Sequence, residues 1–385
     1  MPTSFYPQCA SNSAGTTKSR LSKNATFPPE LLHKNACYLM TPTTTDSTVA
    51  ALLASGKGIL AADESFPSIE KRFQPFNISS TEENRRAYRE MLFTTPGLNA
   101  FISGAILFDE TIRQKTSEGI PLSEVLAKQG MVPGIKVDMG TIALPNFANE
   151  TMTQGLDGLR ERLIEYRQLG ARFTKWRAVI SIGEDIPTCT CIATNARTLA
   201  LFAALSQEAG LVPMVEPEVL MNGSHTIARC EEVTNATLKS VFDALSEHRV
   251  VLEQMLLKTG MVLPGKECPQ QAGVAEVAEA TLRCLRRFVP AAVPGVVFLS
   301  GGQSDEAATE RLNAICRGSD VLWKLTFSFG RALQAPALNI WKGISGNVPA
   351  AQAALHHRAQ CNSFAAQGKY SAQMETTATN ENPGH

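Results

Sequence analysis

The sequence lacks the features that would point to a nucleic-acid-binding or membrane protein. Its 36 basic and 36 acidic side chains cancel, so no overall positive charge favours nucleic acid or an anionic membrane, although a local basic pocket is compatible with this balance. The most hydrophobic tract, Val289 to Leu299, is interrupted by Pro290 and Pro294, and no uninterrupted apolar run is long enough to cross a bilayer. The sequence therefore predicts a soluble protein with neither a nucleic-acid nor a membrane partner.

Cysteine spacing gives no sign of a disulfide framework or of a structural zinc site. The nine cysteines are an odd number without a C-x-x-C motif, and a chain of 385 residues does not need disulfides to be stable. Cys189 and Cys191 flank Thr190, but no second cysteine pair or histidine cluster lies at ligand spacing. We expect reduced thiols, a cytoplasmic location, and neither a metal nor another cofactor.

The two ends of the chain differ in composition from its middle. Residues 1–45 are rich in Ser, Thr, Asn and Pro and carry four basic residues against one acidic residue, Glu30, which predicts a disordered leader. The interpretation of this leader stays open between organelle targeting and a reading without function, which we favour: either a non-functional extension or translation that begins at Met40. At the other end, the polar residues 371–385 predict a flexible tail.

Between these ends, residues 46–370 alternate short apolar segments with longer helix-like stretches. The centres of eight segments lie about 30 to 45 residues apart, which is the length of a strand plus its crossover helix. Their continuous apolar character is typical of parallel strands covered on both faces. Eight units favour an α/β fold of the closed (β/α)8 TIM barrel type over a doubly wound open sheet. The segments are Gly58–Ala62, Ile102–Leu107, Gly134–Val137, Phe173–Trp176, Val212–Val215, Leu252–Leu257, Val296–Leu299 and Leu325–Ser328.

Charged residues gather where these apolar segments end. In a barrel the carboxyl ends of the strands meet at one face, which carries the functional groups. A single charge at a strand end is well explained by a salt bridge at the rim, but so many together favour a site. They are Asp63, Lys136, Asp138, Lys175, Arg177, Glu216, Glu218 and Lys258.

Lys258 is the candidate nucleophile of this group. It ends an apolar segment, and both burial and a nearby cation such as Lys175 would disfavour its charged form. A neutral lysine amine attacks a carbonyl carbon to give an iminium adduct, which withdraws electrons from a neighbouring carbon–carbon bond. Glu216 and Glu218 are the candidate proton carriers, because repulsion between two carboxylates favours protonation of one. Asp63 is the candidate acceptor for the hydroxyl proton that leaves on cleavage.

Two glycine turns predict a phosphate site. Ser300-Gly301-Gly302-Gln303 follows the seventh segment and Ser328-Phe329-Gly330-Arg331 follows the eighth, each before a helix-like stretch. Glycine lets backbone N–H groups approach an anion, a helix amino terminus favours negative charge, and Arg331 donates in a fork. Arg72, Lys136 and Arg177 offer a second cationic pole. The sequence therefore predicts a substrate with a phosphate at each end.

The sequence motifs at and around these strand ends resemble those of the class I fructose-bisphosphate aldolases over residues 45 to 370. Several long motifs in the same order are far more discriminating than any one of them. The tracts that carry the resemblance are Gly58-Ile-Leu-Ala-Ala-Asp-Glu-Ser65, Thr81-Glu-Glu-Asn-Arg-Arg86, Gly134-Ile-Lys-Val-Asp138, Lys175-Trp-Arg177, Val215-Glu-Pro-Glu218, Leu256-Leu-Lys258, Leu299-Ser-Gly-Gly-Gln303 and Phe327-Ser-Phe-Gly-Arg-Ala-Leu333.

The resemblance implies reversible cleavage of fructose 1,6-bisphosphate into dihydroxyacetone phosphate and glyceraldehyde 3-phosphate, in glycolysis and gluconeogenesis. It implies that Lys258 forms the Schiff base, that Glu216 is the principal acid/base with help from Glu218, and that Asp63 and Lys175 surround the cleaved bond. It also implies a metal-free homotetramer. The substrate-binding residues it implies are Ser300, Gly301, Gly302, Ser328, Gly330 and Arg331 for one phosphate, and Ser68, Arg72, Arg85, Lys136 and Arg177 for the other end.

Three departures from the family pattern affect these expectations. Phe66-Pro67 stands where Thr-Gly is frequent, and Met139 stands where a lysine is common. Many relatives end in a tyrosine that assists proton transfer at the enamine carbon, whereas this chain ends in His385, and Tyr370 is no obvious substitute. We therefore expect a slower proton transfer, or one through water or another group.

Two other interpretations stay open. None of the six histidines lies at a predicted strand end, which argues against the unrelated zinc-dependent aldolases. A Schiff-base barrel that acts on a different phosphosugar would share Lys258 but need another second anion pole. A non-catalytic barrel that binds a sugar phosphate or a protein partner is disfavoured, because every inferred catalytic position holds a competent residue.

Overall fold

The computed structural model describes residues 44–317 and 320–376. The predicted leader falls almost wholly outside the described residues. Its last two residues, Thr44 and Thr45, already belong to the first helix, α1 (Thr44–Leu52). Residues 377–385 of the predicted tail also lie outside the described part of the chain.

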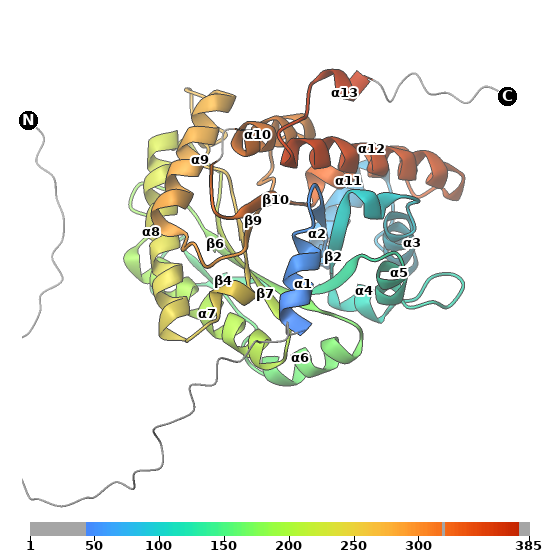
Figure 1. The fold of residues 1–385 in the computed structure, drawn as a ribbon, viewed down its shortest axis with the longest axis horizontal. Helices are drawn as coiled ribbons and strands as arrows, with labels where there is room; N and C mark the ends of the chain where they lie inside the picture. The colour runs from blue at the N-terminus through green and yellow to red at the C-terminus, as the bar shows by residue number, and fades with distance from the viewer. Residues whose placement is uncertain (1–43, 318–319, 377–385) are drawn as a thin grey trace, which may run out of the picture. The chain divides into compact units, whose positions relative to one another are not determined.

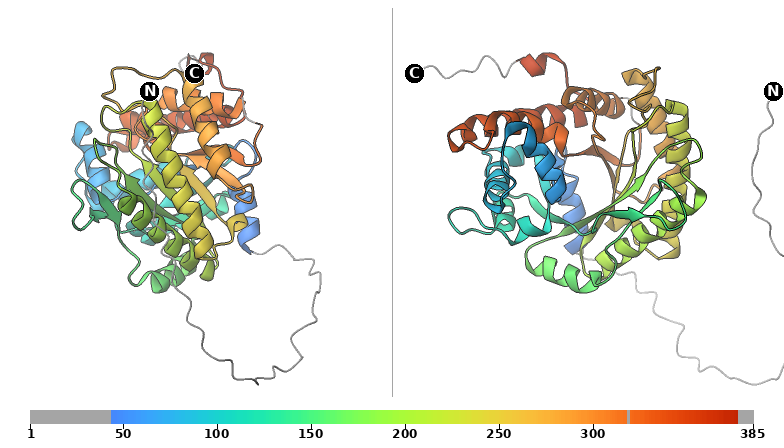
Figure 2. Two further views of the ribbon diagram at one scale, coloured as in Figure 1. Left: turned by 90° about the vertical axis from the view of Figure 1, so that its left-hand side faces the viewer. Right: turned by 180° about the vertical axis from the view of Figure 1, so that it is seen from behind.

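Eight parallel strands close into a barrel in the order β1-β10-β9-β8-β7-β6-β3-β2, as the sequence predicts. Helices surround the strands in the view of Figure 1, and the view from behind in Figure 2 shows the same arrangement. The barrel strands are β1 (Gly58–Ala62), β2 (Ile102–Leu107), β3 (Val132–Lys136), β6 (Phe173–Ile180), β7 (Val212–Val219), β8 (Leu256–Thr259), β9 (Gly295–Phe298) and β10 (Lys324–Phe329).

Longer and shorter helices connect the strands and cover the barrel. The α-helices after α1 are α2 (Phe66–Phe73), α3 (Glu82–Phe93), α4 (Asp109–Arg113), α5 (Leu122–Lys128), α6 (Leu159–Gln168), α7 (Cys189–Glu208), α8 (Ile227–Glu247), α9 (Val274–Phe288), α10 (Asp305–Arg317), α11 (Arg331–Trp341), α12 (Val348–Ala366) and α13 (Gln373–Thr376). Short 3-10 helices are η1 (Gln74–Phe76), η2 (Leu98–Ala100), η3 (Leu252–Gln254) and η4 (Ser345–Asn347).

All eight predicted strands exist, and β1 and β2 have the predicted boundaries, whereas β3, β9 and β10 differ by one or two residues and β6, β7 and β8 by more. β6 and β7 each run four residues beyond the predicted end and pair in register from Phe173↔Val212 to Ile180↔Val219. The expected ends were placed where polar residues begin, but inward-facing polar residues continue a strand at a barrel mouth. The predicted strand Leu252–Leu257 begins instead as η3, and β8 starts only at Leu256.

The barrel interior is filled at its amino-terminal end, which leaves the opposite end for the site. Successive strand residues point to opposite faces. Accordingly, Ile59 packs in the interior cluster, whereas Leu60 packs in the outer cluster under the helices. Val49 and Leu52 of α1 join the interior cluster, so α1 covers this end of the barrel. Asp63 directly follows β1 and therefore lies at the other, carboxyl-terminal end.

One helix of the described residues, α7, is long and apolar enough by length and composition to cross a membrane: it has 20 residues, and an 18-residue window of it has a mean hydropathy of 1.2. The sequence alone did not single out this segment. In the fold α7 packs on β6, β7 and α8, and Phe202 stacks on Trp176 of β6. A barrel helix with a large buried face meets the same criterion, so α7 is weak evidence for a membrane span.

The described residues also form elements outside the barrel plan, among them a hairpin after β3 and a short C-terminal helix. A short antiparallel hairpin, β4 (Thr141–Ala143) with β5 (Thr151–Thr153), follows β3 and was not predicted, because its strands have only three residues each. At the other end, the predicted flexible tail begins in an ordered way: Glu375 of α13 forms an ion pair with the buried guanidinium of Arg358 on α12.

Candidate active site

A pocket of about 1380 Å³ opens at the carboxyl-terminal end of the barrel. Its lining comes from the strand ends and from the loops that follow them, which is the functional face of this architecture. Fifteen of the sixteen residues predicted from the sequence line it: Asp63, Ser68, Arg72, Lys136, Lys175, Arg177, Glu216, Glu218, Lys258, Ser300, Gly301, Gly302, Ser328, Gly330 and Arg331. The exception is Arg85, whose guanidinium binds Glu110 and the Ser80 carbonyl and lies over the Phe66 ring.

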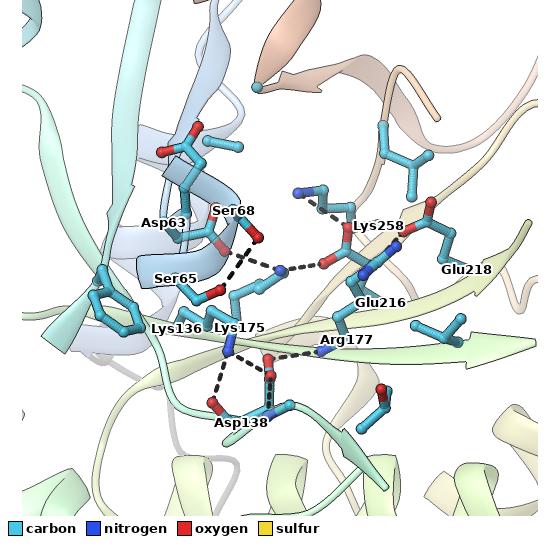
Figure 3. Close-up of a pocket in the computed structure, with 18 of the residues that line it drawn as sticks. Asp63, Ser65, Ser68, Lys136, Asp138, Lys175, Arg177, Glu216, Glu218 and Lys258 are labelled. Atoms are coloured by element: carbon cyan, nitrogen blue, oxygen red, sulfur yellow. Dashed lines mark hydrogen bonds and ion pairs between the residues drawn. The ribbon is translucent and has the colours of Figure 1, made fainter. Parts of the chain in front are cut away.

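A continuous chain of charged groups crosses the floor of the pocket. Lys258 Nζ lies 3.1 Å from Glu216 Oε1, and the other oxygen of Glu216 lies 2.8 Å from Lys175 Nζ. Lys175 Nζ in turn lies 2.9 Å from Asp63 Oδ2. Figure 3 shows these side chains converging from β6, β7, β8 and the end of β1. The arrangement links two lysine nitrogens and two carboxylates in one row of direct contacts.

The charges of these side chains are set by mutual contact, because all four side chains are largely buried. Burial alone would raise the pKa of Asp63, but Lys175 and Lys258 hold this pKa well below its usual range. Burial alone would lower the pKa of Lys175, but Asp63 and Glu216 raise this pKa above its usual value. Asp63 is therefore ionised and Lys175 charged at neutral pH. Asp63 is available to accept a proton, whereas Lys175 serves to fix the two carboxylates.

The contacts differ from the sequence-based expectation in one respect. The expected repulsion between Glu216 and Glu218 is offset, because each carboxylate pairs with at least one cation. The Glu216 carboxylate lies between the ammonium groups of Lys175 and Lys258, and Glu218 pairs with Arg177. The alternation of side chains along β6 and β7 explains this, since Lys175 and Arg177 share one face of β6, and Glu216 and Glu218 share one face of β7.

The two glycine turns after β9 and β10 lie together at one side of the pocket. Gly301 and Gly302 have φ angles of 59° and 87°, which are left-handed values that glycine adopts without strain. Gly330 precedes α11, whose first residue is Arg331, so the amino terminus of an eleven-residue helix faces this side. The buried Ser328 hydroxyl has no hydrogen-bond partner in the described part of the chain. These donors match a phosphate group.

The predicted second pole is partly rearranged. Lys136 pairs with Asp138 and Arg177 pairs with Glu218, and both cations line the pocket from β3 and β6, across the barrel from the glycine turns. Ser68 of α2 also lines the pocket. Arg72 does not join them. It forms an ion pair with Glu64, and a Cβ atom built on Gly330 would lie 3.5 Å from a guanidinium nitrogen of Arg72. Arg72 therefore belongs to the first pole.

Sequence reasoning missed four cations of the pocket lining: Lys71, Arg113, Arg162 and Lys266. Lys266 lines the pocket from the loop after β8 and lies at the glycine turn. A Cβ atom built on Gly302 would lie 3.0 Å from Lys266 Nζ and 3.8 Å from a guanidinium nitrogen of Arg331. Lys266 is seven residues beyond the last residue of β8. A prediction based on strand-end residues alone cannot identify Lys266, although the neighbouring Gly265 indicates a constrained loop.

Among the described residues, no histidine or cysteine lines the pocket. Four carboxylates of the lining already form ion pairs with lysine or arginine: Glu216, Asp63, Asp138 and Glu218.

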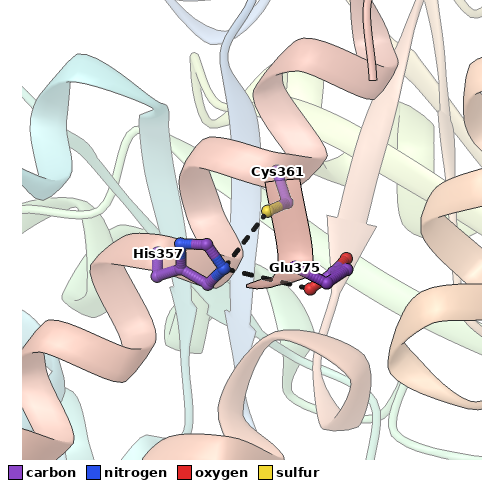
Figure 4. A group of neighbouring side chains, drawn as sticks. All are labelled: His357, Cys361 and Glu375. Atoms are coloured by element: carbon purple, nitrogen blue, oxygen red, sulfur yellow. Dashed lines mark hydrogen bonds and ion pairs between the residues drawn. The ribbon is translucent and has the colours of Figure 1, made fainter. Parts of the chain in front are cut away.

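A group of side chains with metal-ligand atoms lies elsewhere, where His357 Nε2 is 3.6 Å from Cys361 Sγ and 3.9 Å from Glu375 Oε2 (Figure 4). Glu375 already accepts from Arg358 and from the Tyr370 hydroxyl. These contacts attach the C-terminal segment to α12 and keep Tyr370 out of the pocket lining.

The fold and the pocket define a (β/α)8-barrel enzyme with a buried lysine–carboxylate site beside two glycine turns. Residues 45–383 match the family described as "Glycolytic: Fructose-bisphosphate aldolase class-I". The chain therefore belongs to the class-I fructose-bisphosphate aldolase family and is an enzyme of the lyase class. The family predicted from the motifs is confirmed.

Known proteins similar to the chain agree with this assignment. It is 57% identical over 324 residues to a probable fructose-bisphosphate aldolase class 1 of Xanthomonas campestris pv. campestris, covering 84% of this chain and 97% of that protein. It is 51% identical over 346 residues to the cytosolic fructose-bisphosphate aldolase 5 of Arabidopsis thaliana, covering 89% and 92%. A structure of fructose-bisphosphate aldolase from Plasmodium falciparum, in complex with TRAP and a small-molecule inhibitor, superposes with a TM-score of 0.84 at 49% identity, covering 86% and 95%.

Proposed function

We propose that the chain cleaves fructose 1,6-bisphosphate reversibly to dihydroxyacetone phosphate and glyceraldehyde 3-phosphate through a Schiff base on Lys258, in glycolysis and gluconeogenesis. The observation that carries this proposal is the contact of 3.1 Å between Lys258 Nζ and Glu216 Oε1. It places a proton carrier directly on the amine that must gain and lose protons as the Schiff base forms.

The proposed reaction begins when the Glu216 carboxylate takes a proton from Lys258 across their contact of 3.1 Å, and the free amine attacks the substrate carbonyl carbon. Glu216 then carries two protons, one after the other, from the Lys258 nitrogen to the former carbonyl oxygen, which leaves as water and gives an iminium. Asp63 then takes the proton of the hydroxyl on the far side of the scissile bond. The carbon–carbon bond breaks, the aldehyde is released, and the bonding electrons move into the iminium to give an enamine. Protonation of the enamine carbon and hydrolysis of the resulting iminium free Lys258.

Lys175 and Glu218 have supporting roles in this proposal. Lys175 holds Asp63 and Glu216 by contacts of 2.9 and 2.8 Å, so both carboxylates keep their positions when protons move. Glu218 assists from the next inward position of β7, where Arg177 fixes it.

The substrate would lie across the pocket with a phosphate at each end. Lys258 is on β8, which pairs with β9, the strand that precedes Ser300 and the glycine turn. The phosphate next to the reacting carbonyl therefore belongs at Ser300, Gly301, Gly302, Ser328, Gly330 and Arg331, with Arg72 beside them. Ser68, Lys136 and Arg177 would bind the other phosphate. Arg85 is left out, because its guanidinium is fully engaged outside the pocket.

Borohydride trapping tests the mechanism directly. We expect borohydride added together with fructose 1,6-bisphosphate to reduce the iminium and leave a stable adduct, which peptide mass spectrometry would locate on Lys258. EDTA is expected to leave turnover unchanged. Absence of any trapped adduct on active, intact protein would contradict the Schiff-base mechanism, and adduct on another lysine would contradict the assignment to Lys258.

A substrate panel tests the two-phosphate assignment. We expect higher kcat/KM for fructose 1,6-bisphosphate than for fructose 1-phosphate, because only the bisphosphate reaches Ser68, Lys136 and Arg177. Activity confined to fructose 1-phosphate would show that the second pole has been misassigned. Activity on a different phosphosugar with no cleavage of either compound would favour the alternative Schiff-base barrel.

We further propose a cytoplasmic homotetramer that needs no partner protein for catalysis. The name of the cytosolic Arabidopsis relative supports the location. Sedimentation velocity of the full chain tests the assembly, since a tetramer of 41.5-kDa chains separates clearly from the monomer.

A further inference from the structure

We propose that Lys266 is a specificity-determining residue that binds the substrate phosphate next to the reacting carbonyl, together with Arg331, across the Gly301-Gly302 turn. This inference rests on the proposed function, because it assigns a further ligand to one phosphate of the same substrate. It concerns a residue that lies outside the strand ends and outside both glycine motifs.

The backbone of Lys266 is held in place, although its side chain is exposed. Three consecutive backbone N–H groups, those of Gly265, Lys266 and Glu267, donate to carbonyls of the loop after β7 at 2.8, 2.8 and 3.0 Å. A Cβ atom on Gly265 would lie 2.0 Å from the Gly223 carbonyl oxygen, so only glycine allows this approach. The Cα atom of Lys266 is therefore anchored, and only its side chain is free to move.

The side chain of Lys266 reaches the concave side of the glycine turn. Its Nζ and a guanidinium nitrogen of Arg331 lie 3.0 and 3.8 Å from the same point, the position of a Cβ atom on Gly302. Two cations that converge on one point above a glycine turn give the geometry of a phosphate clamp. A side chain at position 302 would fill this space, and the φ angle of 87° disfavours one there.

The charges of Lys266 and Arg331 are uncompensated, which separates them from Lys136 and Arg177. Neither side chain has a hydrogen bond or an ion pair within residues 44–317 and 320–376. By contrast, Lys136 pairs with Asp138 and Arg177 pairs with Glu218. Two like charges held close together without a carboxylate favour a bound dianion. The unpartnered, buried Ser328 hydroxyl lines the same pocket.

This difference between the poles has a consequence for specificity. A phosphate at the Gly302 turn meets two free cations, whereas a phosphate at the other pole must share Lys136 and Arg177 with their carboxylates. The phosphate next to the carbonyl should therefore contribute more of the binding free energy. Lys266 adds to this contribution without touching the reacting atoms, so its removal should affect KM and leave kcat almost unchanged.

The test compares Lys266→Gln with Lys266→Arg in the full-length protein. Loss of one charge-assisted contact to phosphate is expected to raise KM for fructose 1,6-bisphosphate about tenfold, with kcat changed by less than about twofold. Inorganic phosphate should bind about tenfold more weakly to Lys266→Gln by calorimetry, and Lys266→Arg should restore most of the affinity. The dependence of KM on salt concentration should become shallower.

Lys239→Gln is the matched control, because Lys239 is an exposed lysine on α8 that pairs with Asp243 outside the pocket. It should change neither KM nor phosphate binding. Unchanged KM and phosphate affinity in Lys266→Gln would overturn the proposal, and so would a fall in kcat at constant KM. Phosphate calorimetry does not depend on turnover, so a failure of borohydride trapping with intact phosphate effects would count against the proposed reaction alone.

Discussion

Lys258→Met is expected to abolish aldol cleavage, with kcat reduced by at least about 10³-fold, and to abolish borohydride trapping at the same time. Methionine has similar length and fits the buried end of β8, but its thioether cannot form an iminium. Every later step of the proposed reaction passes through an iminium or an enamine on the Lys258 nitrogen. Neither Glu216 nor Lys175, which remain in place, can therefore replace Lys258.

The variant also leaves Glu216 Oε1 without its partner, while Lys175 still neutralises the other oxygen. Removal of one partner from a buried ion pair typically costs about 3 to 5 kcal/mol, so thermal unfolding should be measured beside activity. Lys258→Arg is the second variant, because it keeps the positive charge while its guanidinium is not a nucleophile at neutral pH. Cleavage of fructose 1,6-bisphosphate by folded Lys258→Arg at more than a few per cent of the original rate would contradict the assignment.

The barrel and most of the site could be predicted from the sequence because two strong patterns coincide. Parallel strands buried on both faces read as apolar runs, and charged residues at their carboxyl ends are brought together by the closure of the barrel. Lys258, Glu216, Lys175 and Asp63 are distant along the chain, yet each follows or ends such a run. Their convergence follows from the fold class alone.

What could not be predicted depends on partner choice and loop paths. The sequence places Arg72, Arg85 and Lys136 equally well at one pole, but helices α2 and α3 carry Arg72 to Gly330 and Arg85 to Glu110. Lys266 lies in a loop whose course is set by backbone hydrogen bonds to the loop after β7, and such contacts leave no periodic signal. The pairing of Glu216 with two lysines likewise depends on the register between β6 and β7.

Asp63→Asn is expected to separate the formation of the Schiff base from the cleavage of the carbon–carbon bond. The asparagine amide has the same shape but cannot take the hydroxyl proton, so cleavage of fructose 1,6-bisphosphate should slow by about 10² to 10⁴-fold. Dihydroxyacetone phosphate has no bond to cleave, and its iminium on Lys258 needs only Glu216 as proton carrier. Borohydride should therefore still trap dihydroxyacetone phosphate on the Asp63→Asn variant.

The physical basis of this separation is the charge of the Asp63 carboxylate. Lys175 and Lys258 hold the pKa of Asp63 well below its usual range, so Asp63 is ionised at neutral pH and is free to accept the hydroxyl proton. Asp109→Asn is the control, since Asp109 is a half-exposed carboxylate that lines the same pocket and pairs with Arg113. It should retain cleavage. Parallel loss of cleavage and of dihydroxyacetone phosphate trapping in Asp63→Asn would place Asp63 in Schiff-base formation instead, and leave Glu216 as the candidate acceptor of the hydroxyl proton.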